Sequence, residues 1–162
     1  MILSREKILR LVEEKNILER FNTGCLEGAG YDLRVSRFYR IKGSSHLGVD
    51  HRHMPEVEEI QSNRITLKPG DYLLIETLEK VNMPDNLVAR ILPRSTVFRC
   101  GCSLITAVVD PGYKGTLTLG LKNLSGCEFT LEKESRVGQI VFEEITGETK
   151  PYNGRYQGGK VV

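Results

Sequence analysis

The chain has 162 residues, of which 40% are hydrophobic and 27% are charged, a composition that excludes a disordered, collagen-like or membrane-embedded protein. This length corresponds to about one domain, so we expect a single domain over residues 1–162. Lysine and arginine total 23 against 21 for aspartate and glutamate. The net charge therefore gives no electrostatic reason to expect nucleic acid or a membrane surface as a partner.

The amino-terminal sequence shows no targeting signal. It lacks the apolar run and the small-residue cleavage site of a signal peptide, and no window approaches the length of a membrane span. We therefore expect a cytoplasmic protein. Because cytosolic redox buffers keep thiols reduced, the four cysteines are expected to be free thiols rather than disulfides: Cys25, Cys100, Cys102 and Cys127.

An N-terminal helix is predicted within residues 1–20. Ser4 is a suitable N-cap, and apolar residues then recur at helical spacing among charged ones, with a break expected near Asn16. After this helix the pattern changes to short alternating runs bounded by Gly, Pro or Asn, which indicate strands at residues 64–68, 71–79, 115–122 and 127–133.

The fold class expected from this order is mainly β. No helical stretch of 10 to 15 residues separates the strands, which disfavours parallel βαβ winding and favours an antiparallel sandwich or barrel. Residues 43–63 are polar and poor in pattern, so we expect a long loop or insertion at a sheet edge.

A zinc site is disfavoured by the spacing of its candidate ligands. Three histidines crowd residues 46–53, and Cys100 lies two positions from Cys102, but structural zinc sites separate paired cysteines by two to four residues. The zinc-dependent nucleobase deaminases need His-x-Glu and Pro-Cys-x-x-Cys, which the chain lacks. Glycine-rich phosphate loops, dinucleotide fingerprints and serine-hydrolase elbows are also absent from the sequence.

Two polar clusters stand at strand ends in the first two thirds of the chain. In residues 28–35, glycines lead into a strand that carries Asp32, for which a buried structural role that ties down a turn is the simpler interpretation. Residues 91–101 present two guanidinium groups and two hydroxyls after Pro93, a turn suited to phosphate oxygens. A solvated turn with incidental arginines is the alternative for this second cluster.

A third cluster spans residues 106–123. Val108 and Val109 are expected to end a buried strand, residues 110–113 to form a tight turn, and residues 116–122 to return as the second strand of a hairpin. An aspartate held there, Asp110, could activate water as a general base, although Asp-Pro-Gly turns are also common for structural reasons. Gln139 leads a fourth cluster, and residues 148–162 are expected to form a flexible arm that closes over a ligand.

Taken in this order, the clusters resemble the motifs of the dCTP deaminase and dUTPase superfamily of trimeric nucleotide enzymes. The matching segments are GAGYDLRV, LPRSTVFRCG, AVVDPGYKG, RVGQIVF and the tail PYNGRYQGG. The resemblance implies a distorted antiparallel β-barrel or jelly roll, the dUTPase-like β-clip. It also implies a homotrimer with sites between subunits and a deoxynucleoside triphosphate as the small-molecule partner.

The two activities of this superfamily require different residues. By the resemblance, deamination uses a glutamate ten residues after the aspartate of the Asp-Pro-Gly turn, and here that position is Gly120. Strand alternation puts Thr116 and Thr118 on the same face as Gly120, and neither can act as a carboxylate proton shuttle. A glycine inside a strand often marks the close approach of a ligand, which suits a pyrimidine pocket whose backbone reads the base.

The dUTPase reaction is the one that the matching residues favour. The resemblance implies that Asp110 activates the water that attacks the α-phosphorus, that Mg²⁺ is held mainly by the phosphates, and that Asp32 assists through metal-bound water. Tyr113 would pack on the deoxyribose and disfavour a ribose. The other expected substrate contacts are Arg94, Ser95, Thr96, Arg99, Thr118, Leu119, Gly120, Gln139, Tyr152, Arg155 and Tyr156.

Two further interpretations stay open. One is a dCTP deaminase, bifunctional or not, in which another carboxylate replaces the missing glutamate. The other is a catalytically silent nucleotide-binding homologue. The tail also departs from the deaminase pattern Lys-Tyr-Gln-Gly-Gln, because Gly159 stands where the final Gln is expected.

Overall fold

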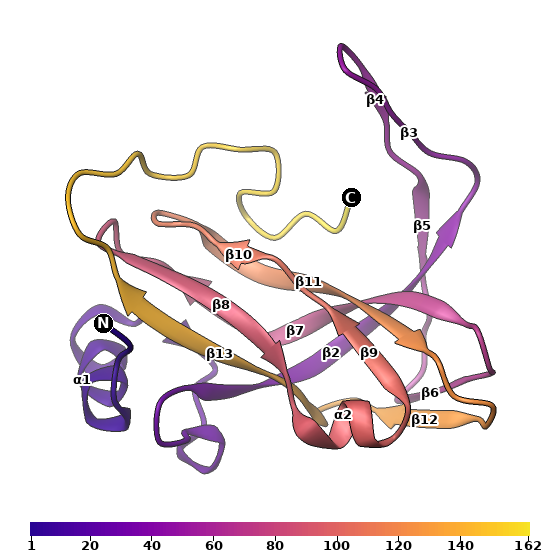
Figure 1. Ribbon diagram of the computed structural model, residues 1–162, viewed down its shortest axis with the longest axis horizontal. Coiled ribbons are helices and arrows are strands. Elements are labelled where there is room, and N and C mark those ends of the chain that lie inside the picture. Colours follow the sequence, from indigo (N-terminus) through magenta and orange to yellow (C-terminus); the bar gives the residue numbers. More distant parts are fainter.

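The computed structural model describes residues 1–162 and is mainly β, which confirms the expected fold class (Figure 1). Its one long helix, α1, spans Arg5–Lys15. The Ser4 hydroxyl accepts a hydrogen bond from the Lys7 backbone N–H, and the helix ends at Asn16 in the left-handed region. Ile8 and Leu11 bury the inner face of α1 in the core. No helix in the chain combines the length and apolar character needed to cross a bilayer.

The principal sheet has nine strands, and every pairing in it is antiparallel. Its path runs β10–β8–β13–β2–β7–β11–β9, with β1 added to β7 and β5 added to β2. The bounds are β1 Leu18–Glu19, β2 Tyr31–Lys42, β5 Glu56–Glu59, β7 Tyr72–Asn82, β8 Leu87–Pro93, β9 Cys102–Ile105, β10 Val108–Val109, β11 Lys114–Asn123 and β13 Arg136–Glu144.

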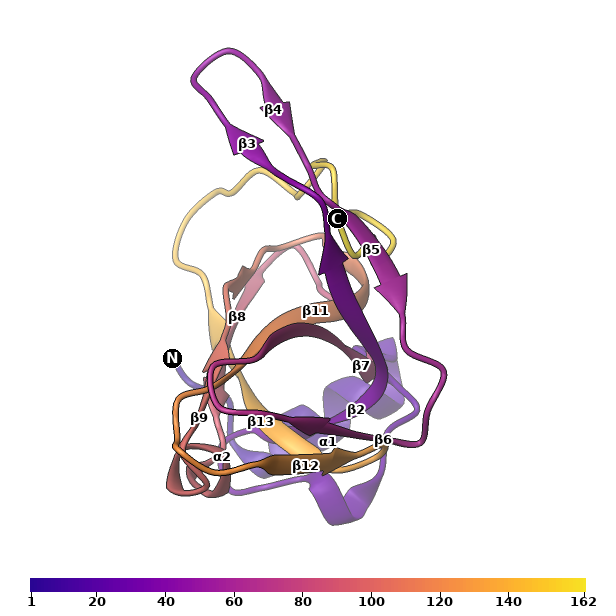
Figure 2. The ribbon, with the colours of Figure 1, turned by 90° about the vertical axis from the view of Figure 1, so that its right-hand side faces the viewer.

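The sheet curls so that its two ends meet (Figure 2). The end strands β9 and β10 are consecutive in the chain, and the Thr106 hydroxyl between them donates to the Ile91 carbonyl of β8 at 2.8 Å. A continuous core fills the curl, and its largest fully buried side chains include Tyr31, Phe38 and Phe142. A small second sheet pairs β6, Arg64–Leu67, with β12, Phe129–Glu132.

The strand predictions agree with the structure at their centres. Residues 64–68, 71–79, 115–122 and 127–133 correspond to β6, β7, β11 and β12. The remaining local elements are a short 3₁₀ helix, η1, at Thr23–Cys25, and a short helix, α2, at Ser95–Arg99. The turn expected after Pro93 is therefore this one-turn helix, which Arg94 precedes in an extended conformation.

Residues 43–63 project from the edge of the sheet as a β-ribbon, in line with the expectation of a long loop or insertion there, but short strands that were not predicted pair within the segment. Strands β3, His46–Leu47, and β4, Arg52–His53, pair with each other, while β5 pairs with the outer end of β2 (Figures 1 and 2). Backbone hydrogen bonds and the surface ion pair Lys42–Glu58, at 2.9 Å, hold the ribbon. Few of its side chains are buried, so no hydrophobic alternation signals it.

The predicted hairpin between residues 108–109 and 116–122 was wrong. β10 pairs with β8, whereas β11 pairs with β7 and β9. Val109 is buried, but Val108 is 54% exposed. The turn at residues 110–113 therefore connects β10 to β11, which do not pair with each other, and it lies at the rim of the curled sheet.

Candidate functional site

A pocket of about 430 Å³ opens beside the turn at residues 110–113. Its walls come from four parts of the chain: the turn with β11, the first half of β7, the segment from β8 to β10, and the C-terminal tail. Most of the lining is apolar, and its residues are Tyr72, Leu74, Ile91, Ile105, Thr106, Ala107, Val108, Val109, Asp110, Tyr113, Leu117, Thr118, Leu119, Gly120, Tyr152, Tyr156, Lys160 and Val161.

Asp110 is the only carboxylate in this lining. The turn that carries it is fixed by backbone hydrogen bonds, in which Met83 N–H donates to the Tyr113 carbonyl at 2.8 Å and Gly112 N–H donates to the Met83 carbonyl at 3.1 Å. Gly112 has a φ of +75°, and a Cβ there would lie 2.8 Å from Cβ of Pro151. A glycine is therefore required beside Asp110 both for conformation and for space.

Tyr113 forms the wall next to Asp110. The side chain is buried, its hydroxyl donates to the Thr116 carbonyl at 2.6 Å, and its ring meets Tyr152 edge to face with centroids 5.6 Å apart. Burial, followed by the influence of Tyr152, raises the pKa of Tyr113 to about 12. The phenol is therefore a fixed, protonated part of the wall rather than an acid or base for catalysis.

Two polar features of β11 face the pocket. Thr118 and Gly120 both line it, and the Thr118 hydroxyl oxygen is buried without a hydrogen-bond partner. Thr116 does not line it, and the register of β11 against β7 shifts by two residues between Thr116 and Thr118. The extra residues lie on β7, where residues 77–79 stand opposite Leu117, so the expectation that Thr116 shares the face of Gly120 stays a prediction.

The C-terminal tail folds back onto the turn of its own chain. The Gln157 side chain accepts from the Lys114 N–H at 2.8 Å and donates to the Gly112 carbonyl at 3.0 Å. Tyr152 N–H donates to the Pro111 carbonyl, and Gly158 N–H donates to the Lys114 carbonyl. These bonds put Tyr152 and Tyr156 in the pocket wall, whereas Arg155 is exposed and does not line it.

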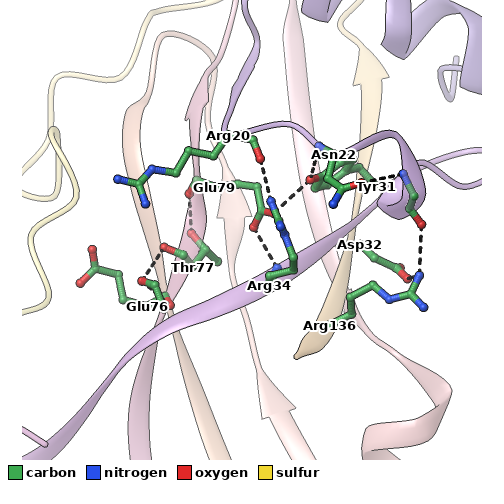
Figure 3. Close-up of polar contacts among 11 residues, drawn as sticks. Arg20, Asn22, Tyr31, Asp32, Arg34, Glu76, Thr77, Glu79 and Arg136 are labelled. Atoms are coloured by element: carbon green, nitrogen blue, oxygen red, sulfur yellow. Dashed lines mark hydrogen bonds and ion pairs between the residues drawn. The ribbon is translucent and has the colours of Figure 1, made fainter. Parts of the chain in front are cut away.

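A second polar group is centred on Asp32, outside the pocket lining. Asp32 is 2% exposed, and its Oδ2 lies 2.8 Å from Nε of Arg94 and 3.4 Å from Nη1 of Arg136 (Figure 3 shows Asp32 and Arg136). Burial raises the pKa of Asp32 in spite of these two cations. Gln139 is paired with Asp32 across β13 and β2. One cluster thus joins segments that are about 100 residues apart.

The predicted site residues therefore fall into two groups within one chain. Asp110, Tyr113, Thr118, Leu119, Gly120, Tyr152 and Tyr156 share the pocket. Arg94, Ser95, Thr96, Arg99, Gln139 and Asp32 lie on or beside α2 and the adjoining ends of β2 and β13, away from the tail (Figure 1). Ser95, Thr96 and Arg99 are exposed on the surface there.

The residues at these sites that were not anticipated include Tyr72 and Lys160 in the pocket, Gln157 in the tail, and Arg136 beside Asp32. Lys160 could have been found as a cation next to the aromatic tail. Tyr72 and Arg136 gave no local signal, because their positions depend on long-range strand pairing.

Another buried network lies near Asp32 but belongs to neither group. The Glu79 carboxylate is fully buried and accepts from Nε of Arg34 at 2.7 Å, from the Arg34 backbone N–H at 2.8 Å and from the Tyr31 hydroxyl at 3.0 Å (Figure 3). Burial and the Glu79 carboxylate raise the pKa of Tyr31. These hydrogen bonds lie within the curled sheet and join β2 to β7.

The histidines and cysteines do not form a metal centre. No group of three or more His, Cys, Asp or Glu side chains is arranged to hold a metal ion. His46 and His51 stack at 4.9 Å on the exposed ribbon, and all four cysteines are free, two buried and two exposed.

Comparison with solved structures supports the fold. The chain is similar to a 2'-deoxycytidine 5'-triphosphate deaminase from Agrobacterium tumefaciens, with a TM-score of 0.70, 19% identity and coverage of 87% of this chain. It spans only 47% of the length of that deaminase chain. It is also similar to a variant dUTPase of Staphylococcus bacteriophage 80alpha solved with dUpNHpp, with a TM-score of 0.53, 18% identity and coverage of 85% and 96% of the two chains.

Sequence relatives carry both activities in their names. A probable deoxyuridine 5'-triphosphate nucleotidohydrolase of Methanothermobacter thermautotrophicus is 36% identical over 82% of this chain and 87% of its own length. A dCTP deaminase of Thermococcus sibiricus is 37% identical over 99% of this chain and 94% of its own. A family model described as dCTP deaminase-like matches residues 2–145. The chain therefore belongs to the dCTP deaminase-like family of nucleotide-metabolising enzymes.

Proposed function

We propose that this protein is a dUTP diphosphatase, which hydrolyses dUTP to dUMP and pyrophosphate with Mg²⁺. The observation that carries the proposal is the composition of the pocket, in which Asp110 is the only carboxylate and position 120 is glycine. Hydrolysis at phosphorus needs one base to take a proton from water. Deamination of a cytosine ring needs a carboxylate that delivers protons to the ring, and the pocket lining has no carboxylate besides Asp110.

In the proposed reaction Asp110 accepts a proton from a water molecule while the oxygen of that water attacks the α-phosphorus. The new phosphorus–oxygen bond forms while the bond from the α-phosphorus to the bridging oxygen breaks, and pyrophosphate leaves with that oxygen. Asp110 is exposed at the rim, next to the apolar wall of Val108 and Val109. A base at this edge can reach water while the nucleoside lies deeper, and the fixed turn holds it in place.

Magnesium would neutralise charge on the leaving pyrophosphate, and the donor groups of the chain suit an ion held mainly by the substrate. No cluster of three acidic or imidazole ligands could enclose it, and Mg²⁺ commonly binds through phosphates and one or two carboxylates while keeping several waters. The role of Asp32 through metal-bound water stays a prediction. Its ion pairs with Arg94 and Arg136 give it a second role, in orienting those cations.

The remaining expected contacts keep their proposed roles. Arg94, Arg99, Ser95, Thr96 and Gln139 would bind phosphate oxygens, through charge and positioning. Tyr113 would pack on the deoxyribose. Thr118, Leu119 and Gly120 would contact the base, and Tyr152, Tyr156 and Arg155 would close the tail over the nucleotide.

We further propose that the working enzyme is a homotrimer with sites shared between subunits. Within one chain the phosphate-binding candidates on α2 lie outside the pocket that contains Asp110. Exposed apolar side chains also surround these elements: Leu92, Phe98, Ile105, Val108 and Leu124. An apolar surface of this kind suits contact with other copies of the chain, and a closed three-fold ring would bring α2 of one subunit to the pocket of the next.

A dCTP deaminase is the second candidate, because relatives named dCTP deaminase match nearly the whole chain. On β7, the strand next to β11, the buried carboxylate of Glu76 is paired with Thr118 in the sheet. Glu76 does not line the pocket, and it accepts a hydrogen bond from the Tyr39 hydroxyl at 2.6 Å. It is thus already engaged, which favours the diphosphatase.

One assay separates the candidates. The protein is incubated with dUTP and, separately, with dCTP, each with Mg²⁺, and pyrophosphate and ammonia are measured independently. We expect pyrophosphate and dUMP from dUTP and no ammonia from dCTP. Ammonia from dCTP would show a deaminase, alone or bifunctional, and binding of dUTP without any product would show a silent homologue.

A further inference from the structure

Tyr72 lies over Gly120 in the lining of the pocket. Tyr72 begins β7, and its position is diagonal to Gly120 across the pairing of β7 with β11, in which Lys122 faces Tyr72 and Gly120 faces Leu74. Both Tyr72 and Gly120 line the pocket. The phenol therefore occupies the space above a residue that has no side chain of its own.

Tyr72 in its present position leaves no room for a side chain at position 120. An ideal Cβ on Gly120 would lie 2.5 Å from Oη of Tyr72, 3.0 Å from its Cε2 and 3.1 Å from Cβ of Ile105. The backbone at Gly120 lies outside the left-handed region, so conformation alone would permit another residue. Space is the reason for glycine: while Tyr72 keeps this position, a side chain at 120, a carboxylate included, does not fit.

The chemistry of this end of the pocket is that of neutral hydroxyls. A tyrosine phenol is protonated at neutral pH, and partial burial raises the pKa of Tyr72 further. The second hydroxyl is that of Thr118 on β11, which also lines the pocket and has no hydrogen-bond partner. A protonated phenol is a better donor than acceptor, and it therefore suits a ring carbonyl more than an amino group.

We propose that Tyr72 is the specificity-determining residue of the pocket: it contacts the pyrimidine, donates to the C4 carbonyl of uracil, which is an amino group in cytosine, and excludes a catalytic side chain at position 120. The inference rests on the proposed function, because it takes the occupant to be a deoxyuridine nucleotide. It assigns to one residue both the preference for uracil over cytosine and the requirement for glycine on the facing strand.

The test is a set of binding measurements on the intact protein with dUMP and dCMP, by calorimetry. Tyr72→Phe removes only the hydroxyl and should weaken dUMP binding by about three- to tenfold, the usual range for one hydrogen bond, with little change for dCMP. Tyr39→Phe is the matched control, because its hydroxyl bonds to Glu76 outside the pocket. The control should leave the ratio of the two affinities unchanged.

The steric part is tested by a double-mutant cycle of Gly120→Ala and Tyr72→Ala. Gly120→Ala alone displaces the phenol and should weaken dUMP binding by about tenfold, whereas in the Tyr72→Ala background the same change should have an effect of less than about twofold. Equal losses in both backgrounds, or an unchanged affinity ratio in Tyr72→Phe, would overturn the inference. In either case a wild-type protein that binds dUMP and hydrolyses dUTP leaves the proposed function standing, whereas a wild-type protein that does neither removes both.

Discussion

The buried carboxylate of Asp32 lies 2.8 Å from Nε of Arg94, so the first polar motif of the chain is an ion-pair partner of the second. Arg136 approaches the same oxygen from β13 at 3.4 Å. Three segments distant in sequence thus meet around one carboxylate. Arginines held this way are oriented before a phosphate arrives, which reduces the entropy lost on binding.

Replacing Arg94 by Gln should destabilise the protein and make its stability depend more strongly on pH. Without Arg94 the buried charge of Asp32 has one ion-pair partner fewer. We therefore expect the free energy of unfolding to fall by about 2 kcal/mol near neutral pH. The pKa of Asp32 is already raised by burial, and the variant should raise it further. Because the folded state then binds the proton more tightly than the unfolded state, the loss should be largest near pH 8 and shrink as the pH falls.

Thermal unfolding of Arg94→Gln at several pH values measures this effect. The control is Arg10→Gln, which removes an exposed pair with Glu6 one helical turn away and should change stability by less than about 0.5 kcal/mol at any pH. A loss in Arg94→Gln that is the same at low and high pH would contradict the account of Asp32.

Replacing Asp110 by Asn should abolish turnover while leaving nucleotide binding intact. The amide keeps the size of the side chain but cannot accept a proton, so kcat for dUTP should fall by about 10²- to 10⁴-fold with little change in the affinity for dUMP. Asp85→Asn, in an exposed turn outside the pocket, is the control. Near-normal turnover in Asp110→Asn would remove Asp110 from the role of base.

Mixing two inactive variants tests whether the site is shared between subunits. Asp110→Asn and Arg99→Ala should each be inactive alone. After joint refolding in equal amounts, a site that takes Asp110 from one subunit and Arg99 from another should be intact in about a quarter of cases, so activity should return to about that fraction. Asp110→Asn mixed with Asp110→Ala cannot complement and is the control; no recovery in the first mixture would place both residues in one chain.

Gln157 should hold the tail over the pocket. Its amide accepts from the Lys114 N–H and donates to the carbonyls of Gly112 and Tyr152, and Gln157→Ala removes all three bonds. We expect KM for dUTP to rise by about tenfold or more, because these hydrogen bonds are lost, and we expect a protease to cleave the tail faster. Asn153→Ala, exposed in the same tail, should change neither property.

The sequence predicted those elements whose apolar residues alternate, because burial of one face of a strand imposes that pattern. β7 and β11 were found in this way. The strands within residues 43–63 were not predicted, because backbone pairing holds this segment with few buried side chains. The pairing of β10 with β8 was missed because a two-residue strand has no period and the turn at Asp110 suggested a local hairpin.

The candidate site shows the same division between local and long-range information. Asp110 and Gly120 could be proposed from sequence, because turn residues and a glycine within a strand have local causes. Tyr72 could not, since it reaches Gly120 only through the register of β7 against β11. Arg136 and Asp32 are 104 residues apart in the chain, and no local pattern connects them.

The most direct test of the central claim is hydrolysis of dUTP by the wild-type protein in water enriched in ¹⁸O, with Mg²⁺, followed by mass spectrometry of the products. Attack of water on the α-phosphorus should place one ¹⁸O atom in dUMP and none in pyrophosphate. Label in pyrophosphate or in orthophosphate, or the absence of dUMP, would contradict the assignment of this protein as a dUTP diphosphatase.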